Sequence, residues 1–206
     1  MKKIKLYSVL FASIAIVVLG MTSCNDSSYS RPLTPEQIKT AYFTVRGTHT
    51  GKMYFLKEAP NDNMNSESQK AETDSVDISW TIDTDSTMII HDFPTHAFAE
   101  FVADDEMKEA LLQQPNQDVK CQTLYWSLSP ICFSVGVVAP TYNITYGGKE
   151  HKVQLVFYTG ADFYGVFDNA TKYMNINLMA GGLYIDDEPQ ASATKTTNIP
   201  FLLVKK

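Results

Sequence analysis

The feature that most constrains the fold is a strict alternation of apolar and polar residues between positions 76 and 82. The apolar positions are Val76, Ile78, Trp80 and Ile82, and Asp, Ser or Thr stands between them. Side chains of a β-strand point alternately to its two faces, so this period of two predicts a strand with one buried and one solvated face. Polar residues 83–86 follow, and residues 87–91 resume a strand pattern. The segment therefore predicts an antiparallel hairpin.

Short apolar segments of this kind recur along the rest of the chain. Turn residues separate them, above all Gly147-Gly148, which predicts a tight hairpin turn. We expect strands at residues 48–56, 76–82, 87–91, 124–128, 131–138, 142–146, 151–158, 163–167, 173–179, 183–185 and 199–204.

Two segments carry helix signals. Thr34 is typical of an N-cap, Pro35 of the first helical position and Gln37 of a capping-box partner, so a short helix is predicted that ends near Gly47. A second helix is predicted at residues 97–113, with a break at the acidic residues 104–106. About ten strands with two short helices predict a mostly β protein with minor α (α+β), built as an antiparallel β-sandwich or a partly closed barrel.

The N-terminal segment has the pattern of an export signal. It begins with Lys2, Lys3 and Lys5, continues with 16 mainly apolar residues and ends at Ser23-Cys24. A transmembrane helix needs about 20 apolar residues, so this run is short for a membrane span. We expect residues 1–23 to be a lipoprotein signal peptide, Cys24 the lipidated residue, residues 24–32 a tether and residues 33–206 a single β-rich domain.

The charge of the chain excludes one class of partner. Removal of residues 1–23 takes three lysines and no acid, so the formal net charge changes from −6 to −9. An acidic chain without basic clusters disfavours nucleic acid as a partner, because phosphate backbones bind Lys and Arg.

The two remaining cysteines, Cys121 and Cys132, allow two interpretations. In an exported protein they can form a disulfide, if the strands that carry them are adjacent. Alternatively, both are small buried side chains, which the apolar neighbours of Cys132 favour.

No motif predicts catalysis or a cofactor. His91, Asp92 and His96 are close in sequence, but their spacing across Pro94 matches no familiar set of metal ligands. The HExxH motif, the nucleophile elbow and the glycine-rich phosphate loop are absent from the sequence. The sequence therefore predicts a non-enzyme without a metal or other cofactor.

Aromatic residues supply the best indication of a binding role. They make up 12% of the chain, and exposed rings stack on sugars and anchor protein partners. Tyrosine also suits half-buried strand positions, so no single one identifies a site. The tyrosines on predicted strands and turns are Tyr142, Tyr146, Tyr158, Tyr164, Tyr173 and Tyr184.

Several segments resemble small uncharacterised envelope lipoproteins of gut Bacteroidetes. They are Ser23-Cys24, residues 33–38, residues 47–53, the Asp85-Ser86-Thr87-Met88 segment with Asp92-Phe93-Pro94, and Tyr146-Gly147-Gly148-Lys149. The resemblance implies a compartment and no catalytic residue. It also implies a candidate O-glycosylation site at Ser75, within Asp74-Ser75-Val76.

The function predicted from these features is a membrane-anchored, non-catalytic lipoprotein of the cell envelope. We expect it to sit at the outer membrane, on either the periplasmic or the surface face, and to bind a glycan or an envelope protein. The alternatives are a structural or assembly component of an outer-membrane complex, and a lipocalin-like carrier of a small apolar ligand.

Overall fold

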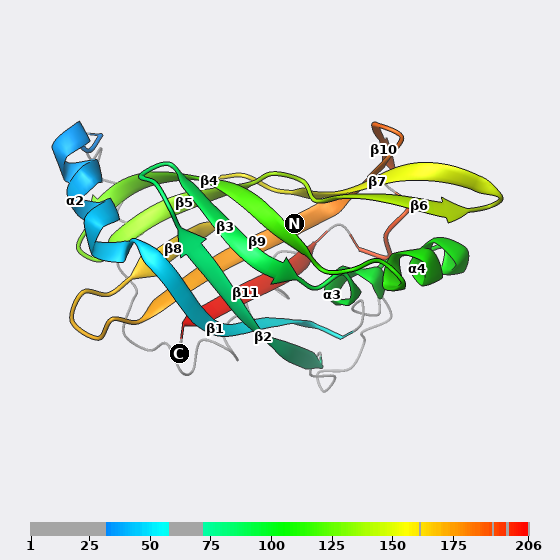
Figure 1. Cartoon of the computed structure of the whole chain (residues 1–206), viewed down its shortest axis with the longest axis horizontal. Coiled ribbons are helices and arrows are strands. Elements are labelled where there is room, and N and C mark those ends of the chain that lie inside the picture. Colours follow the sequence, from blue (N-terminus) through cyan, green and yellow to red (C-terminus); the bar gives the residue numbers. More distant parts are fainter. Residues whose placement is uncertain (1–31, 58–71, 161, 191, 197, 206) are drawn as a thin grey trace, which may run out of the picture.

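The computed structural model describes residues 32–57, 72–160, 162–190, 192–196 and 198–205 (Figure 1). The predicted signal peptide, Cys24 and most of the tether lie outside these residues. The helices are α2 (Pro35–Val45), α3 (His96–Ala99) and α4 (Asp105–Leu112). The strands are β1 (Gly47–Leu56), β2 (Thr73–Ile82), β3 (Thr87–Phe93), β4 (Gln117–Leu128), β5 (Ile131–Val137), β6 (Thr141–Tyr146), β7 (Lys149–Phe157), β8 (Tyr164–Phe167), β9 (Met174–Ile185), β10 (Glu188–Gln190) and β11 (Ile199–Lys205).

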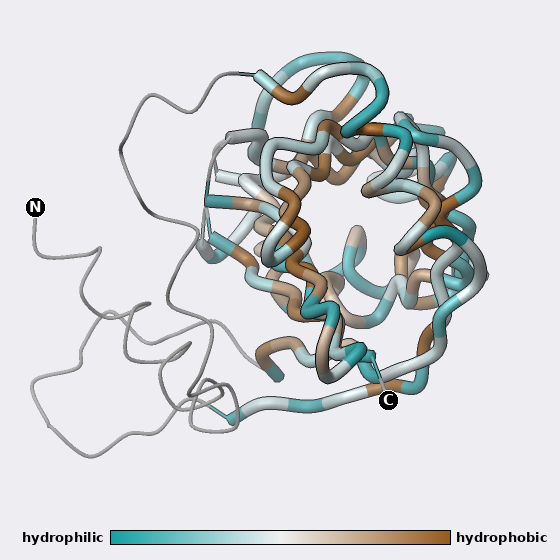
Figure 2. Tube along the Cα trace, turned by 90° about the vertical axis from the view of Figure 1, so that its left-hand side faces the viewer, coloured by the Kyte–Doolittle hydropathy of each residue, from teal (hydrophilic) through white to brown (hydrophobic). Residues whose placement is uncertain are grey.

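Eight of these strands close into an antiparallel barrel. Their order is β11-β1-β2-β3-β4-β5-β8-β9, and β11 also pairs with β9, which joins the two ends of the sheet. The strands surround a common axis in Figure 2, with α2 at one end of the barrel and α3 and α4 at the other (Figure 1). The structure confirms a mostly β, barrel-like fold and does not show the sandwich that the sequence left open.

Large apolar side chains fill the interior of the barrel. Trp80, Met88 and Phe133 alternate with outward-facing residues on their strands, and each is 0% exposed. The indole N–H of Trp80 donates to Sδ of Met174 across the barrel, at 3.4 Å. An eight-stranded barrel is just wide enough for side chains to fill it. Each such side chain stabilises the fold by about 1.5–3 kcal/mol relative to leaving it exposed.

A small second sheet, which we call the flap, extends from one end of the barrel. It consists of β6, β7, β10 and the C-terminal half of β9. The first half of β9 belongs to the barrel, where it pairs with β8 and β11. α3 and α4 pack next to the flap; the rings of Phe98 (α3) and Tyr142 (β6) lie 5.5 Å apart. One core cluster spans the interior of the barrel and the underside of the flap.

The helix signals in the sequence are confirmed. The hydroxyl of Thr34 accepts the N–H of Gln37 at 3.3 Å, and the Gln37 side chain accepts the N–H of Thr34 at 2.8 Å. The second predicted helix is broken as expected, because the Asp104 carboxylate caps α4 by accepting the N–H of Met107 at 2.8 Å.

The short strand β10 is not predicted, and the bounds of β4 and β9 differ from the prediction. β4 begins at Gln117 instead of residue 124, since its first half alternates buried Val119 and Cys121 with charged and polar residues and has low overall hydrophobicity. The sequence predicts two separate strands at residues 173–179 and 183–185, but β9 is continuous. Gly181 and Gly182 do not break it; they stand where the strand leaves the barrel and enters the flap.

The disulfide between Cys121 and Cys132 is not formed in this structure, where Cys121 is a free, buried thiol. The register of β4 and β5 places Cys121 opposite Val137 and Cys132 opposite Ser127. Cys121 also faces the barrel interior, whereas Cys132 alternates with the inward-facing Phe133. Burial raises the pKa of the Cys121 thiol to about 12.

Candidate functional site

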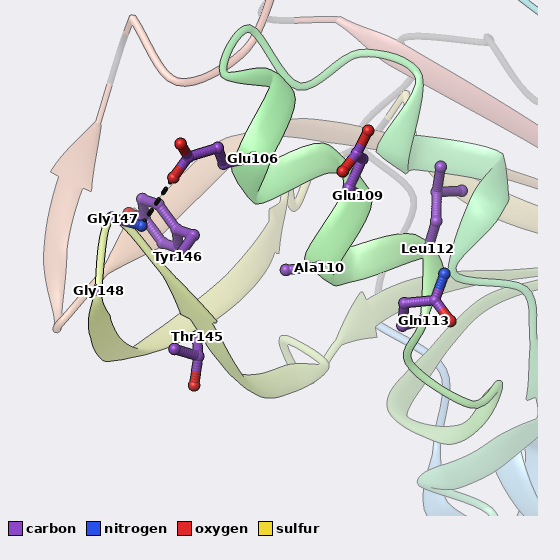
Figure 3. A pocket seen from close by; sticks show the side chains of 9 residues that line it. All are labelled: Glu106, Glu109, Ala110, Leu112, Gln113, Thr145, Tyr146, Gly147 and Gly148. Atoms are coloured by element: carbon purple, nitrogen blue, oxygen red, sulfur yellow. Dashed lines mark hydrogen bonds between the residues drawn. The ribbon is translucent and has the colours of Figure 1, made fainter.

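The candidate site is a groove between α4 and the β6–β7 hairpin (Figure 3). It has a volume of about 580 Å³, within the range that small-molecule and peptide sites occupy. Its lining residues come from two segments far apart in the sequence. They are Glu106, Glu109, Ala110 and Leu112 of α4, its C-cap residue Gln113, and Thr145, Tyr146, Gly147 and Gly148 of the hairpin.

A hydrogen bond from the hairpin tip to the first turn of α4 fixes one end of the groove. Gly147 and Gly148 have φ values of +55° and +75°, which a two-residue turn of this kind requires. The turn aims the N–H of Gly147 at Oε2 of Glu106, which accepts it at 2.9 Å (Figure 3). This contact joins residues 41 positions apart, so it sets the position of α4 relative to the flap.

A tilted ring contact next to the groove orients Tyr146. The rings of Tyr146 and His151 lie 4.4 Å apart. His151 is in turn held by Asp186, whose Oδ2 lies 2.8 Å from Nδ1 of the imidazole. Burial, with the nearby Asp104 and Asp186, raises the pKa of the Tyr146 phenol. The phenol is therefore a hydroxyl donor at neutral pH.

The groove runs along the outer edge of β6, where backbone groups point away from β7. The N–H of Leu155 donates to the carbonyl of Pro140 at 3.1 Å, which makes these two a hydrogen-bonded pair. In an antiparallel ladder every second residue bonds the same neighbour. Residues 142, 144 and 146 thus bond β7, while Thr141, Asn143 and Thr145 direct their N–H and C=O groups outward.

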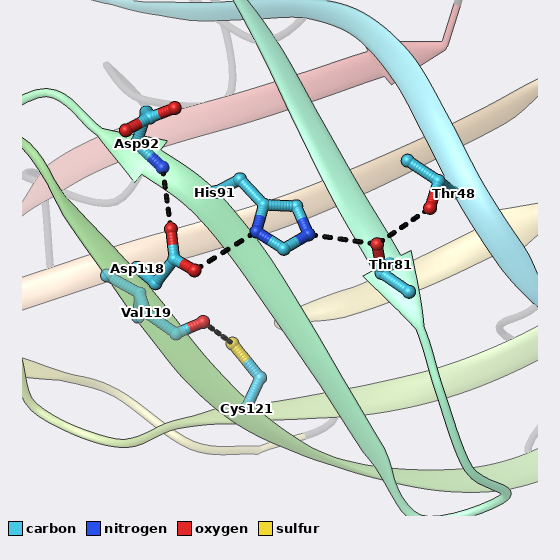
Figure 4. A network of polar contacts seen from close by, with 7 residues as sticks. All are labelled: Thr48, Thr81, His91, Asp92, Asp118, Val119 and Cys121. Atoms are coloured by element: carbon cyan, nitrogen blue, oxygen red, sulfur yellow. Dashed lines mark hydrogen bonds and ion pairs between the residues drawn. The ribbon is translucent and has the colours of Figure 1, made fainter.

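A second polar network lies on the outer wall of the barrel (Figure 4). Nδ1 of His91 lies 3.1 Å from Oδ2 of Asp118, and Nε2 of His91 lies 2.9 Å from the hydroxyl of Thr81. The Thr81 hydroxyl is also 2.9 Å from that of Thr48. The order hydroxyl, imidazole, carboxylate is the order of a hydrolase triad.

The backbone around Thr81 takes part in strand pairing on both sides. Thr81 lies within β2, which pairs with β1 on one side and β3 on the other. The backbone N–H groups next to Thr81 therefore serve the ladders and are not free to form an oxyanion hole. Oδ1 of Asp118, the carboxylate oxygen that does not contact His91, accepts the N–H of Asp92 at 3.1 Å. The network is a clamp between neighbouring strands, and it leaves the groove as the candidate site.

The same clamp recurs beside the groove. Oδ1 of Asp186 accepts the N–H of Lys152, the residue after His151, at 3.0 Å. In the same way, Asp118 accepts the N–H of Asp92, the residue after His91. Backbone donation, followed by the imidazole contact, lowers the pKa of both aspartates.

The structure places the residues that the sequence predicted as sites in different environments. Cys24 lies outside the described residues, and Ser75 is half-buried in β2 opposite Tyr54. Among the tyrosines, Tyr142 is buried, Tyr146 lines the groove, and Tyr158 and Tyr184 are exposed elsewhere.

The sequence did not point to the acidic and polar residues that α4 and its C-cap contribute to the groove. Glu106, Glu109 and Gln113 look like the solvated face of an ordinary helix. The sequence signals for the groove are the Gly147-Gly148 turn and Tyr146, one of the tyrosines considered for binding, and neither says which helix lies beside them.

The described ranges show neither a metal cluster nor a membrane-spanning helix. They contain no group of three or more His, Cys, Asp or Glu side chains that could hold a metal ion. Within the same residues, no helix combines the length and apolar character that crossing a membrane requires.

Comparison with known proteins gives one match. A family model described as a domain of unknown function (DUF4840) matches residues 44–185. No curated protein sequence and no solved structure matches the chain significantly. The matched range contains the whole groove, from Glu106 to Gly148, and ends with β9.

Proposed function

For this chain, which belongs to the DUF4840 family of domains of unknown function, we propose the role of a non-catalytic binding module of the cell envelope. Its ligand is a glycan or a protein, and Cys24 anchors it to the membrane, in the arrangement of an outer-membrane lipoprotein. The sequence of residues 1–24 supports the anchor. The groove between α4 and the β6–β7 hairpin carries the binding proposal.

The composition of the groove supports a binding role. It combines carboxylates, an amide, a hydroxyl, an aromatic residue and outward backbone groups, which are the groups that orient a polar ligand. Among the described residues that line the groove, none is a histidine, cysteine or serine, and its ionisable side chains are Glu106, Glu109 and Tyr146.

Two alternatives have structural support of different weight. The open outer edge of β6 favours an assembly role, because unpaired strand edges pair with other chains. The closed barrel has the architecture of a carrier, but Trp80, Phe133 and other large side chains occupy its interior. The carrier role is therefore the weaker of the two.

Direct binding tests the proposal. The full-length protein in detergent is screened against an array of envelope glycans and a panel of short peptides. Hits are then measured with Tyr146→Ala and with the matched control Tyr184→Ala, since Tyr184 is an exposed flap tyrosine outside the groove. We expect Tyr146→Ala to weaken binding about tenfold or more and Tyr184→Ala to leave it unchanged. Equal effects of the two variants would contradict the assignment of the groove.

A further inference from the structure

We propose that the groove binds a short extended protein segment with basic side chains, which adds to the outer edge of β6 as a further strand. This inference rests on the binding function proposed above and names the ligand class. It has three independent supports: the free backbone groups of β6, the apolar surface of α4 beside them, and the charge of the groove lining.

The edge of β6 is closed at both ends and open between them. At one end, Gln117 Nε2 donates to the carbonyl of Thr141, at 3.4 Å. At the other end, Gly147 donates to Glu106. Between these contacts, the outward N–H and C=O groups of Asn143 and Thr145 have no hydrogen-bond partner within the part of the chain that the structure describes. Two complete rungs of a ladder are thus available.

Free rungs of this kind bind extended peptides. A peptide that aligns with an exposed strand forms main-chain hydrogen bonds, and its alternate side chains enter pockets on either side. Successive strands lie about 4.8 Å apart, and each residue advances about 3.4 Å. The two rungs at Asn143 and Thr145 therefore correspond to a ligand of about four or five residues.

α4 provides the surface on which such a strand would pack. Its contacts with the flap are mainly to β6, and in Figure 1 it lies on the side of β6 away from β7. On α4, Leu112 is 39% exposed and Ala110 is half-buried, and both line the groove. Side chains of an added strand that point toward α4 would cover these two apolar residues.

The charge of the groove favours a basic ligand. The lining residues that the structure describes include Glu106 and Glu109 and no Lys, Arg or His. A ligand without positive charge would remove water from these carboxylates and offer no opposite charge in return. A lysine or arginine at alternate positions of the peptide would reach toward the carboxylate side and pair with them.

A peptide satisfies the groove better than a sugar does. The outward backbone N–H and C=O groups of Asn143 and Thr145 alternate as donors and acceptors with the spacing of a β-strand. The backbone of another extended peptide has the complementary groups at the same spacing. A glycan would use the hydroxyls and the Tyr146 ring, but the tilted ring of His151 already lies against the Tyr146 ring, with 4.4 Å between the ring centres. The observations therefore favour a peptide, and glycan binding is an outcome that the experiment must distinguish.

The experiment uses the full-length protein in detergent and a capped hexapeptide with lysine at every second position and valine or threonine between. Binding is measured by fluorescence anisotropy, and amide protection by hydrogen exchange with mass spectrometry. Two further peptides carry N-methyl groups, one on the odd and one on the even amides. We expect binding with slower exchange at residues 141–147, and loss of binding of about tenfold or more for only one of the two methylated peptides, because only one set of amides faces β6.

Variants of the protein make a second test. Thr145→Pro removes an outward N–H that no ladder partner uses, and proline is tolerated at such edge positions. Thr145→Val keeps the N–H and is the matched control. We expect Thr145→Pro to weaken binding about tenfold, Thr145→Val to leave it unchanged, and Glu109→Gln to weaken it about threefold with a shallower dependence on salt.

The other outcomes are distinct. Equal loss with both methylated peptides, or equal binding by Thr145→Pro and Thr145→Val, would overturn strand addition. Equal binding of the hexapeptide with glutamate in place of lysine would overturn the basic specificity. Protection of residues 141–147 by maltoheptaose but not by the peptide would overturn this inference and leave the binding module in place. Absence of protection by both, together with a ligand that binds equally to Tyr146→Ala, would contradict the groove itself.

Discussion

Gly165 lies against the ring of Phe133 inside the barrel, and its replacement by alanine is the sharpest test of the packing described above. The two residues are directly opposite each other on β5 and β8. A Cβ on residue 165 would stand 2.3 Å, 2.5 Å and 2.9 Å from three carbons of the Phe133 ring. Carbon atoms at optimal separation are about 3.5–4.0 Å apart, so the overlap with the nearest carbon is on the order of 1 Å. Gly165→Ala therefore requires the ring to move.

The cost follows from the burial of that ring. Phe133 is 0% exposed and contacts Tyr125, whose ring lies 5.3 Å away, so it cannot shift without displacing its neighbours. Overpacking of this kind costs about 1–3 kcal/mol. For a chain of this length each kcal/mol lowers Tm by about 2–4 °C. We expect Gly165→Ala to lower Tm by about 2–12 °C.

The assay is thermal or urea unfolding of the variant beside Gly136→Ala. Gly136 is the matched control, because an added Cβ there would meet its nearest atoms at 3.9 Å, an ordinary contact. The double variant Gly165→Ala with Phe133→Leu should lose less stability than the sum of the single variants, since the smaller side chain makes room for the methyl group. A change in unfolding free energy below about 0.5 kcal/mol for Gly165→Ala would refute the reasoning.

Three further predictions concern single groups. The Cys121 thiol, with its pKa of about 12, should react with a thiol reagent at pH 8 only as fast as the protein unfolds, and rapid labelling of the native protein would contradict its burial. The pKa values of Asp118 and Asp186 are lowered in the fold, so their contribution to stability is complete above the unfolded pKa of about 4 and is lost as pH falls through the folded pKa. Urea unfolding between pH 6 and pH 2 should show this loss, and Asp118→Asn should make the dependence shallower. Cys24→Ala should move the protein from the membrane fraction to the soluble fraction, and retention in the membrane would contradict lipidation at that residue.

Features that depend on neighbouring residues can be read from the sequence. The capping box of Thr34 and Gln37 and the hairpin of β2 and β3 are of this kind, because a few adjacent residues determine each. The closure of the barrel cannot be read from the sequence in this way, because the pairing of β11 with β1 joins the two ends of the domain. The groove cannot be predicted from neighbouring residues either, because Glu106 and Gly147 meet only when the fold brings α4 to the hairpin tip.

The last strand of the barrel also bears on where the family domain ends. The matched range stops at residue 185, whereas β11 begins at Ile199 and is the strand between β1 and β9. A recombinant fragment cut to residues 44–185 would lack this strand and expose two long hydrogen-bonding edges. Such edges pair with other copies of the same chain, so the fragment should aggregate. A fragment that extends through Lys205 keeps β11 and its pairing with β1 and β9. The folding unit is therefore longer than the segment that the family model matches.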